Sequence, residues 1–107
     1  MKQIRLSEKD FQKQIVELAE IYGWQIHAEL PAQRQSGNWV TPIQGHKGFP
    51  DLVLAKGKRL IFAELKSDKG KTSQEQNIWL LLLKQTGAEV YLWKPLNWPE
   101  IQEILTR

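Results

Sequence analysis

Three charged side chains stand in a stretch of the chain that is otherwise apolar or rich in turn residues. Asp51 follows a Gly-Phe-Pro sequence, and Glu64 and Lys66 end an apolar run over residues 60–66. The composition of this run predicts a β-strand, in which residues two apart share one face. Glu64 and Lys66 are therefore expected on the same face, and charges on an apolar strand need either a partner or a chemical role.

Asp51 can reach Glu64 if the two segments form a hairpin. Residues 52–55 predict a strand, and the basic residues 56–59 predict a turn. A two-residue loop at Gly57-Lys58, or a four-residue loop, places Asp51 opposite Glu64. A two-residue loop one position earlier makes the two carboxylates diagonal neighbours, and a three-residue loop puts them on opposite faces. Carboxylates this close repel each other unless a cation lies between them, and Mg²⁺ prefers such oxygen ligands.

These residues resemble the conserved pattern of the PD-(D/E)XK nuclease superfamily, and in particular its VRR-NUC branch. The resemblance rests on residues 48–51, on residues 64–66 and on the downstream Gln76, and it extends from the first helix to residues 93–95. It implies an α/β fold with a restriction-endonuclease-like core, in which a mixed β-sheet is flanked by helices. It also implies a DNA endonuclease that uses Mg²⁺ or Mn²⁺, with residues 1–107 as a single VRR-NUC-like nuclease domain.

The resemblance implies a role for each residue of the pattern. Asp51, Glu64 and the backbone carbonyl of Leu65 would hold the metal ion. Lys66 would position the nucleophile or stabilise developing negative charge, and Gln76 would orient water or phosphate. The residues alone leave a simpler interpretation open, in which Glu64 and Lys66 form a structural salt bridge and Gln76 is a surface amide in the first turn of a helix.

The first helix adds one further acidic candidate. The pattern predicts a helix over residues 7–22, capped by Ser7 and ended by Gly23. Its predicted buried stripe consists of Phe11, Ile15, Leu18 and Tyr22. Glu8 lies one turn before this stripe. It is either an acid favoured by the helix dipole or, as the resemblance implies, a residue close to the metal.

Residues 31–47 form the least regular part of the sequence, after a strand predicted over residues 24–30. They are interpreted either as a polar surface loop or as a loop that faces DNA, with Trp39 stacking on a base. His27 is expected to be an ordinary strand histidine. The residues expected to contact DNA in this loop and in the basic loop over 67–71 are Arg34, His46, Lys47, Lys69 and Lys71.

The last part of the chain predicts a helix over residues 74–86, a strand over 89–93 and a short helix that Asn97 caps. Several apolar residues here exceed what a small monomer is expected to cover, and we expect part of them to form a homodimer interface. They are Ile78, Trp79, Trp98, Ile101, Ile104 and Leu105.

Composition sets outer bounds on function. The chain has 107 residues, a formal net charge of +3, two histidines and no cysteine, which excludes disulfides and cysteine-based zinc sites. No signal peptide or membrane span is visible, so a cytoplasmic protein of a bacterial or phage-infected cell is expected. The proposed partner is DNA, with Holliday junctions or branched DNA favoured by the resemblance. The alternative is a nucleic-acid-binding module that keeps the nuclease fold without catalysis.

Overall fold

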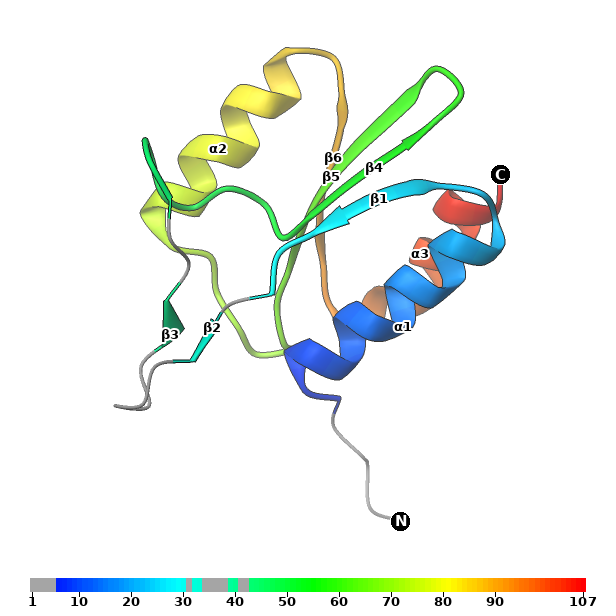
Figure 1. Cartoon of the computed structure of the whole chain (residues 1–107), viewed down its shortest axis with the longest axis horizontal. Coiled ribbons are helices and arrows are strands. Elements are labelled where there is room, and N and C mark those ends of the chain that lie inside the picture. The colour runs from blue at the N-terminus through cyan, green and yellow to red at the C-terminus, as the bar shows by residue number, and fades with distance from the viewer. Residues whose placement is uncertain (1–5, 31, 34–38, 41–42) are drawn as a thin grey trace.

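A mixed four-stranded sheet in the order β1-β4-β5-β6 organises the protein. The computed structural model describes residues 6–30, 32–33, 39–40 and 43–107. Its elements are α1 (Glu8–Ile21), β1 (Gln25–Ala28), β2 (Ala32–Gln33), β3 (Trp39–Val40), β4 (Leu52–Lys56), β5 (Arg59–Leu65), α2 (Gln74–Gln85), β6 (Glu89–Trp93), the 3₁₀ turn η1 (Pro95–Asn97) and α3 (Trp98–Thr106). The predicted α/β class, with a mixed sheet flanked by helices, is confirmed (Figure 1).

The two faces of the sheet are covered differently. Helices α1 and α3 lie together on one face, and α2 lies on the other (Figure 1). The first face holds the buried core, to which α1, α3 and alternate residues of β4 and β5 contribute. Helix α2, by contrast, contains no fully buried residue. The face that carries Glu64 is therefore the less tightly packed of the two.

The hairpin of β4 and β5 has the register that a Gly57-Lys58 turn predicts. Lys56 pairs with Arg59 at the turn, and the ladder continues to the pair Leu52 and Ala63. Gly57 has a φ of 59°, which favours glycine at this position. Continuation of the ladder by one residue brings Asp51 opposite Glu64, as this loop length requires.

Helix α1 is capped as predicted, but its buried face differs at one end. The Ser7 hydroxyl accepts a hydrogen bond from the Asp10 amide at 3.1 Å. Tyr22 is the C-terminal cap and is 41% exposed, so its place in the predicted stripe is wrong. Ala19 is buried in its stead, because Tyr22 already lies beyond the last helical residue.

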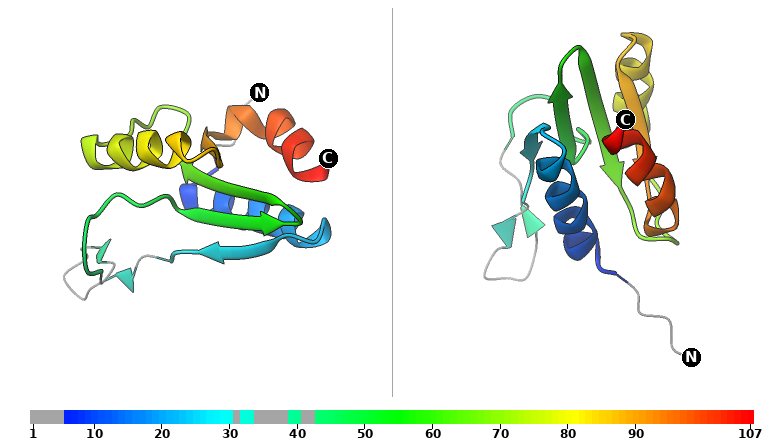
Figure 2. Two further views of the ribbon diagram at one scale, coloured as in Figure 1. Left: turned by 90° about the horizontal axis from the view of Figure 1, so that it is seen from above. Right: turned by 90° about the vertical axis from the view of Figure 1, so that its right-hand side faces the viewer.

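The predicted irregular loop contains regular structure. Strands β2 and β3 pair antiparallel through Ala32 with Val40 and Gln33 with Trp39. Figure 2 shows this small ladder to one side of the main sheet. Arg34, a predicted DNA contact, lies outside the described residues.

The C-terminal helix corrects two predictions. The Asn97 side chain accepts a hydrogen bond from the Lys94 amide at 2.9 Å and makes no cap for α3, because η1 intervenes. The apolar residues assigned to a dimer surface on this helix lie in the core instead: Ile101, Ile104 and Leu105 are 0%, 8% and 0% exposed. Among the described residues, no helix has the length and apolar character needed to cross a membrane.

The approach of α2 to the sheet depends on Gly48, which has a φ of +97°. A Cβ at this position would lie 2.7 Å from the Glu75 carbonyl carbon and 2.9 Å from the Gln76 nitrogen. Gly45 has a φ of +102° but no atom within 4 Å of the corresponding point. A substitution at Gly45 therefore tests backbone strain alone, whereas one at Gly48 tests backbone strain together with a steric clash against α2.

We predict that Gly48→Ala destabilises the protein more than Gly45→Ala does. Each substitution should cost about 1–2 kcal/mol for the backbone conformation. Gly48→Ala should cost about 1–3 kcal/mol more, because its methyl group must displace the first turn of α2. Chemical denaturation measures both free energies of unfolding, and equal losses for the two variants would contradict the close approach.

Candidate active site

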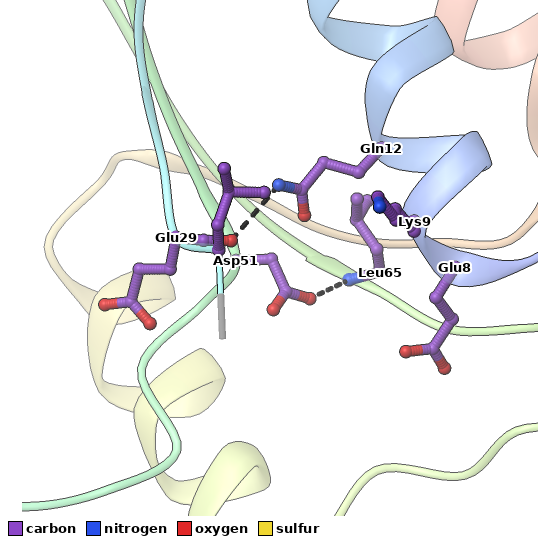
Figure 3. A pocket seen from close by; sticks show the side chains of 7 residues that line it. Glu8, Lys9, Gln12, Glu29, Asp51 and Leu65 are labelled. Atoms are coloured by element: carbon purple, nitrogen blue, oxygen red, sulfur yellow. Dashed lines mark hydrogen bonds between the residues drawn. The ribbon is translucent and has the colours of Figure 1, made fainter. Parts of the chain in front are cut away.

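Asp51 and Glu64 meet where β4 begins and β5 ends. Pro50, immediately before Asp51, is fully buried. The Oδ2 atom of Asp51 accepts a hydrogen bond from the Leu65 amide at 2.8 Å (Figure 3). The hairpin register and this bond together fix the Asp51 carboxyl beside the end of β5.

Glu64 is the one charged residue in the core of the described part of the chain, with 1% of its surface exposed. Its Oε2 atom accepts a hydrogen bond from the Gln76 side-chain amide at 3.1 Å. Its Oε1 atom is buried and has no hydrogen-bond partner among the described residues. A buried polar atom without a partner costs free energy, so this oxygen requires a proton or a ligand.

The environment of Glu64 opposes its negative charge. Burial and then the negative charge of the neighbouring Asp51 carboxyl raise the pKa of Glu64 from 4.5 to about 9. The Lys66 ammonium lowers this pKa by a smaller amount, and the Glu8 carboxylate raises it slightly. In the absence of a cation, Glu64 therefore keeps its proton at neutral pH.

The donor set fits a hard divalent cation. Two carboxyl groups lie together, and one buried carboxyl oxygen lacks a partner, which is the arrangement that a Mg²⁺ or Mn²⁺ ion satisfies. Among the described residues, no group of three or more His, Cys, Asp or Glu side chains could hold a metal. A metal site here would therefore need backbone or water oxygens besides Asp51 and Glu64.

Glu8 stands across a neighbouring pocket from Asp51. The pocket has a volume of about 400 Å³ and includes Asp51 and Leu65 in its wall (Figure 3). Glu8 lies in the first turn of α1, where the helix dipole favours an acid, and it shares this pocket with Asp51. The helix-dipole and the metal interpretations are thus both compatible with its position.

Lys66 follows β5 directly, and its amide donates to the Trp93 carbonyl at 3.0 Å. This bond continues the pairing with β6 and fixes the backbone beside Glu64. Glu64 and Lys66, which are both described, form no ion pair in the structure. The simpler interpretation of the two as a structural salt bridge therefore lacks the contact on which it depends.

Gln76 lies in the first turn of α2, where it is partly buried and contacts Glu64, so it is not a free surface amide. The Oε1 atom of Gln76 accepts a hydrogen bond from the Ser73 backbone amide at 2.8 Å, and the backbone amide of Gln76 donates one to the Ser73 hydroxyl at 3.2 Å. This capping box starts α2. The remaining Nε2 group binds Glu64, so the first turn of α2 is tied to the buried carboxyl.

A cleft of about 580 Å³ lies over the two carboxyl groups. His46 and Lys47, both predicted DNA contacts, line it together with Asp51, Glu64 and Gln76. Lys47 Nζ lies 3.6 Å from Glu75 Oε1, and both side chains remain well exposed.

The other predicted DNA contacts lie elsewhere. Lys69 and Lys71 are exposed in the loop after Lys66 and do not line this cleft. Their role as DNA contacts stays a prediction.

Sequence reasoning missed what Trp79 does. Its indole nitrogen donates to the carbonyls of His46 at 3.3 Å and Lys47 at 3.1 Å. Its ring also packs edge-on against Phe49, with 5.0 Å between centroids. Trp79 therefore anchors the loop before Gly48 instead of lying in a free apolar surface. The sequence feature that could have indicated this role is the position of Trp79 three residues after Gln76.

Comparisons with known proteins identify a family for the chain. The VRR-NUC domain model matches residues 7–94. Among solved structures, the chain is similar to Hjc of Archaeoglobus fulgidus, described as a Holliday junction resolvase from an archaeal hyperthermophile. Identity is 22% and the TM-score 0.49, over 83% of this chain and 69% of that chain. None of the curated proteins compared with the chain matches it.

We predict that Glu64→Gln stabilises the metal-free protein at alkaline pH. The folded protein holds the Glu64 proton more tightly than the unfolded chain, whose value is 4.5. The resulting stability is complete below pH 4.5 and is lost as the pH rises toward 9. In chelator at alkaline pH, the variant should be more stable by a few kcal/mol, within the roughly 6 kcal/mol that a pKa change from 4.5 to about 9 allows. In acid the two proteins should unfold alike. A difference in stability between the two proteins that stays the same at every pH would contradict a buried, protonated Glu64.

Proposed function

The chain belongs to the VRR-NUC family of nuclease domains, and we propose that it is a metal-dependent DNA endonuclease that hydrolyses phosphodiester bonds. One observation carries the metal dependence: the buried Glu64 carboxyl lies beside Asp51 with one oxygen that has no partner among the described residues. A divalent cation bound there would stabilise the ionised Glu64 carboxylate, which burial and the charge of Asp51 disfavour.

Asp51, Glu64 and the carbonyl oxygen of Leu65 are the residues that we propose to hold Mg²⁺ or Mn²⁺. When bound, such an ion supplies a water of lowered pKa and offsets negative charge at the phosphate. The protein's own contribution is preorganisation. The Leu65 amide holds Asp51, and Gln76 holds Glu64, so neither carboxyl has to be ordered when the site is filled.

Lys66 is the proposed electrophilic group of the site. Its charge already acts on Glu64, and its backbone is fixed by the bond to Trp93. An ammonium in this place can stabilise negative charge that develops on the phosphate during hydrolysis. Gln76 is proposed to keep Glu64 aimed at the site.

DNA is the proposed substrate, with Holliday junctions or other branched DNA favoured by the resemblance to small stand-alone nucleases. His46 and Lys47 lie at the cleft and can contact phosphates. The rival from another class is a DNA-binding module without catalysis. The cytoplasm of a bacterial or phage-infected cell stays the proposed location, because a DNA-cutting enzyme meets its substrate there.

A homodimer is the proposed assembly, on the part of the first predicted surface that lies on α2, where Ile78 stays exposed. Helix α2 exposes Ile78, Leu81 and Leu82, by 51%, 59% and 54%. Their spacing places them on one side of the helix. Ile78 and Leu82 lie beside the loop that carries His46 and Lys47. Contact between two copies there would cover these side chains.

We predict that Lys66→Ala lowers the rate of cleavage of four-way DNA in Mn²⁺ by about 100-fold or more. DNA binding, measured by gel shift in chelator, should change little, because it depends on several phosphate contacts. Lys58→Ala, which removes an equal charge at the turn between β4 and β5, serves as the control and should cut at the parental rate. Parental cleavage by Lys66→Ala would contradict the catalytic role. Binding without cleavage by the parent protein would favour the rival.

We predict that light scattering gives the mass of a dimer at micromolar concentration. Leu82→Glu should yield a monomer, because it places a charge in the apolar surface of α2. Leu96→Glu alters another exposed leucine, 76% exposed, and should leave the dimer intact. A monomeric parent, or a dimer that Leu82→Glu does not change, would contradict this interface.

A further inference from the structure

We propose that Gln12 of α1 is a positioning residue that sets the metal affinity of the site by holding the backbone on which Asp51 stands. The inference rests on the proposed function, because it takes Asp51 as a metal ligand. Gln12 belongs to neither the family pattern nor the residues expected to touch DNA. Its role follows from three consecutive hydrogen bonds.

The first two bonds join α1 to the backbone of Asp51. The side-chain amide of Gln12 donates to the Glu29 carbonyl at 3.2 Å (Figure 3). The Glu29 amide donates to the Asp51 carbonyl at 3.2 Å. The third bond is from the Leu65 amide to Asp51 Oδ2 at 2.8 Å. Asp51 is therefore held at its backbone from one side and at its carboxyl from the other.

Glu29 needs this support because it lies where the chain leaves the sheet. The ladder between β1 and β4 ends at Ala28 and Leu52, so Glu29 is already beyond the last strand pair. The hydrogen bond from the Glu29 amide to Asp51 extends the pairing of β1 with β4 by one residue. The bond from Gln12 ties this residue to α1. Without Gln12, the end of β1 would be attached to the sheet by a single terminal hydrogen bond, and such ends fray.

The place of Gln12 in the pocket wall agrees with a local role. Gln12 lines the pocket of about 400 Å³ together with Asp51, Leu65 and Glu29. It is partly buried, and its bond spans 17 residues of sequence, so it ties α1 to the end of β1. Loss of the bond should loosen Asp51 without opening the core.

Weaker positioning has a specific consequence for function. A ligand that must be ordered during binding lowers the affinity for the metal, whereas the filled site can still reach the same geometry. Loss of a residue that orients a metal ligand typically weakens metal affinity by 10- to 100-fold. We expect metal affinity to fall by about 10-fold when the Gln12 amide is removed. The rate at saturating metal should stay within about twofold of the parental rate.

The experiment compares Gln12→Met with Gln14→Met. Methionine keeps the length of the side chain and removes the amide donor. Gln14 is a partly buried glutamine two residues further along α1 that makes no side-chain hydrogen bond within the described part of the chain. Calorimetry measures Mn²⁺ binding to each protein without DNA, and thermal unfolding in chelator measures the fold. Gln12→Asn, which is polar but one methylene too short, replaces the methionine variant if that does not fold.

The expected result is about a 10-fold weaker Mn²⁺ affinity for Gln12→Met, with parental affinity for Gln14→Met and similar unfolding of both in chelator. Parental affinity in Gln12→Met, or a loss no larger than in Gln14→Met, would overturn the inference. Asp51→Asn separates this failure from a failure of the proposed function. If Asp51→Asn abolishes Mn²⁺ binding while Gln12→Met leaves it intact, only the inference is wrong. If Asp51→Asn binds Mn²⁺ like the parent, the ligand assignment and the inference both fall.

Discussion

The burial of one carboxyl group beside another is the constraint on which the site depends. Glu64 is buried without a cationic partner, and the Asp51 carboxyl lies close to it. The surrounding structure holds this unfavourable pair in place instead of relieving it: the β4–β5 register sets the distance, and Gln76 secures one oxygen. This arrangement costs stability and leaves the Oε1 oxygen of Glu64 without a partner among the described residues, ready to receive a cation. Binding sites commonly differ from cores in this way.

The division of the sheet into two unlike faces makes such a site possible. The face under α1 and α3 carries the buried apolar residues and supplies most of the stability. The face under α2 is joined by fewer contacts, chiefly Phe49, which packs edge-on between Phe62 and Trp79. Gly48 lets the first turn of α2 come close, and that turn brings Gln76 to Glu64. The site thus lies on the less tightly packed face, at a cleft of about 580 Å³.

The sequence predicted the elements that local chemistry determines. The sequence predicted the hairpin and left its loop length open, and the Gly57-Lys58 turn is the alternative that forms. It also predicted Thr72 or Ser73 as the start of α2, and Ser73 is the cap. Other features depend on distant partners. An apolar stripe shows that α3 has a face to bury but not what buries it, so its assignment to a dimer surface was wrong. The Asn97 side chain makes no cap bond to α3, because it accepts its hydrogen bond from Lys94 at the start of the 3₁₀ turn. The contact of Gln12 could not be predicted from the sequence, because its partner is a backbone carbonyl and does not depend on residue type.

The most direct test of the account is the titration of the Glu64 carboxyl itself, followed by carbon NMR with selectively labelled glutamate and assigned through Glu64→Gln. Without metal, the account predicts a pKa of about 9 for this group, and saturating Mg²⁺ should bring it below the ordinary value of 4.5. A carboxyl that titrates in the ordinary range without metal, or one whose pKa does not respond to Mg²⁺, would contradict the proposal that this pair is built to hold a divalent ion.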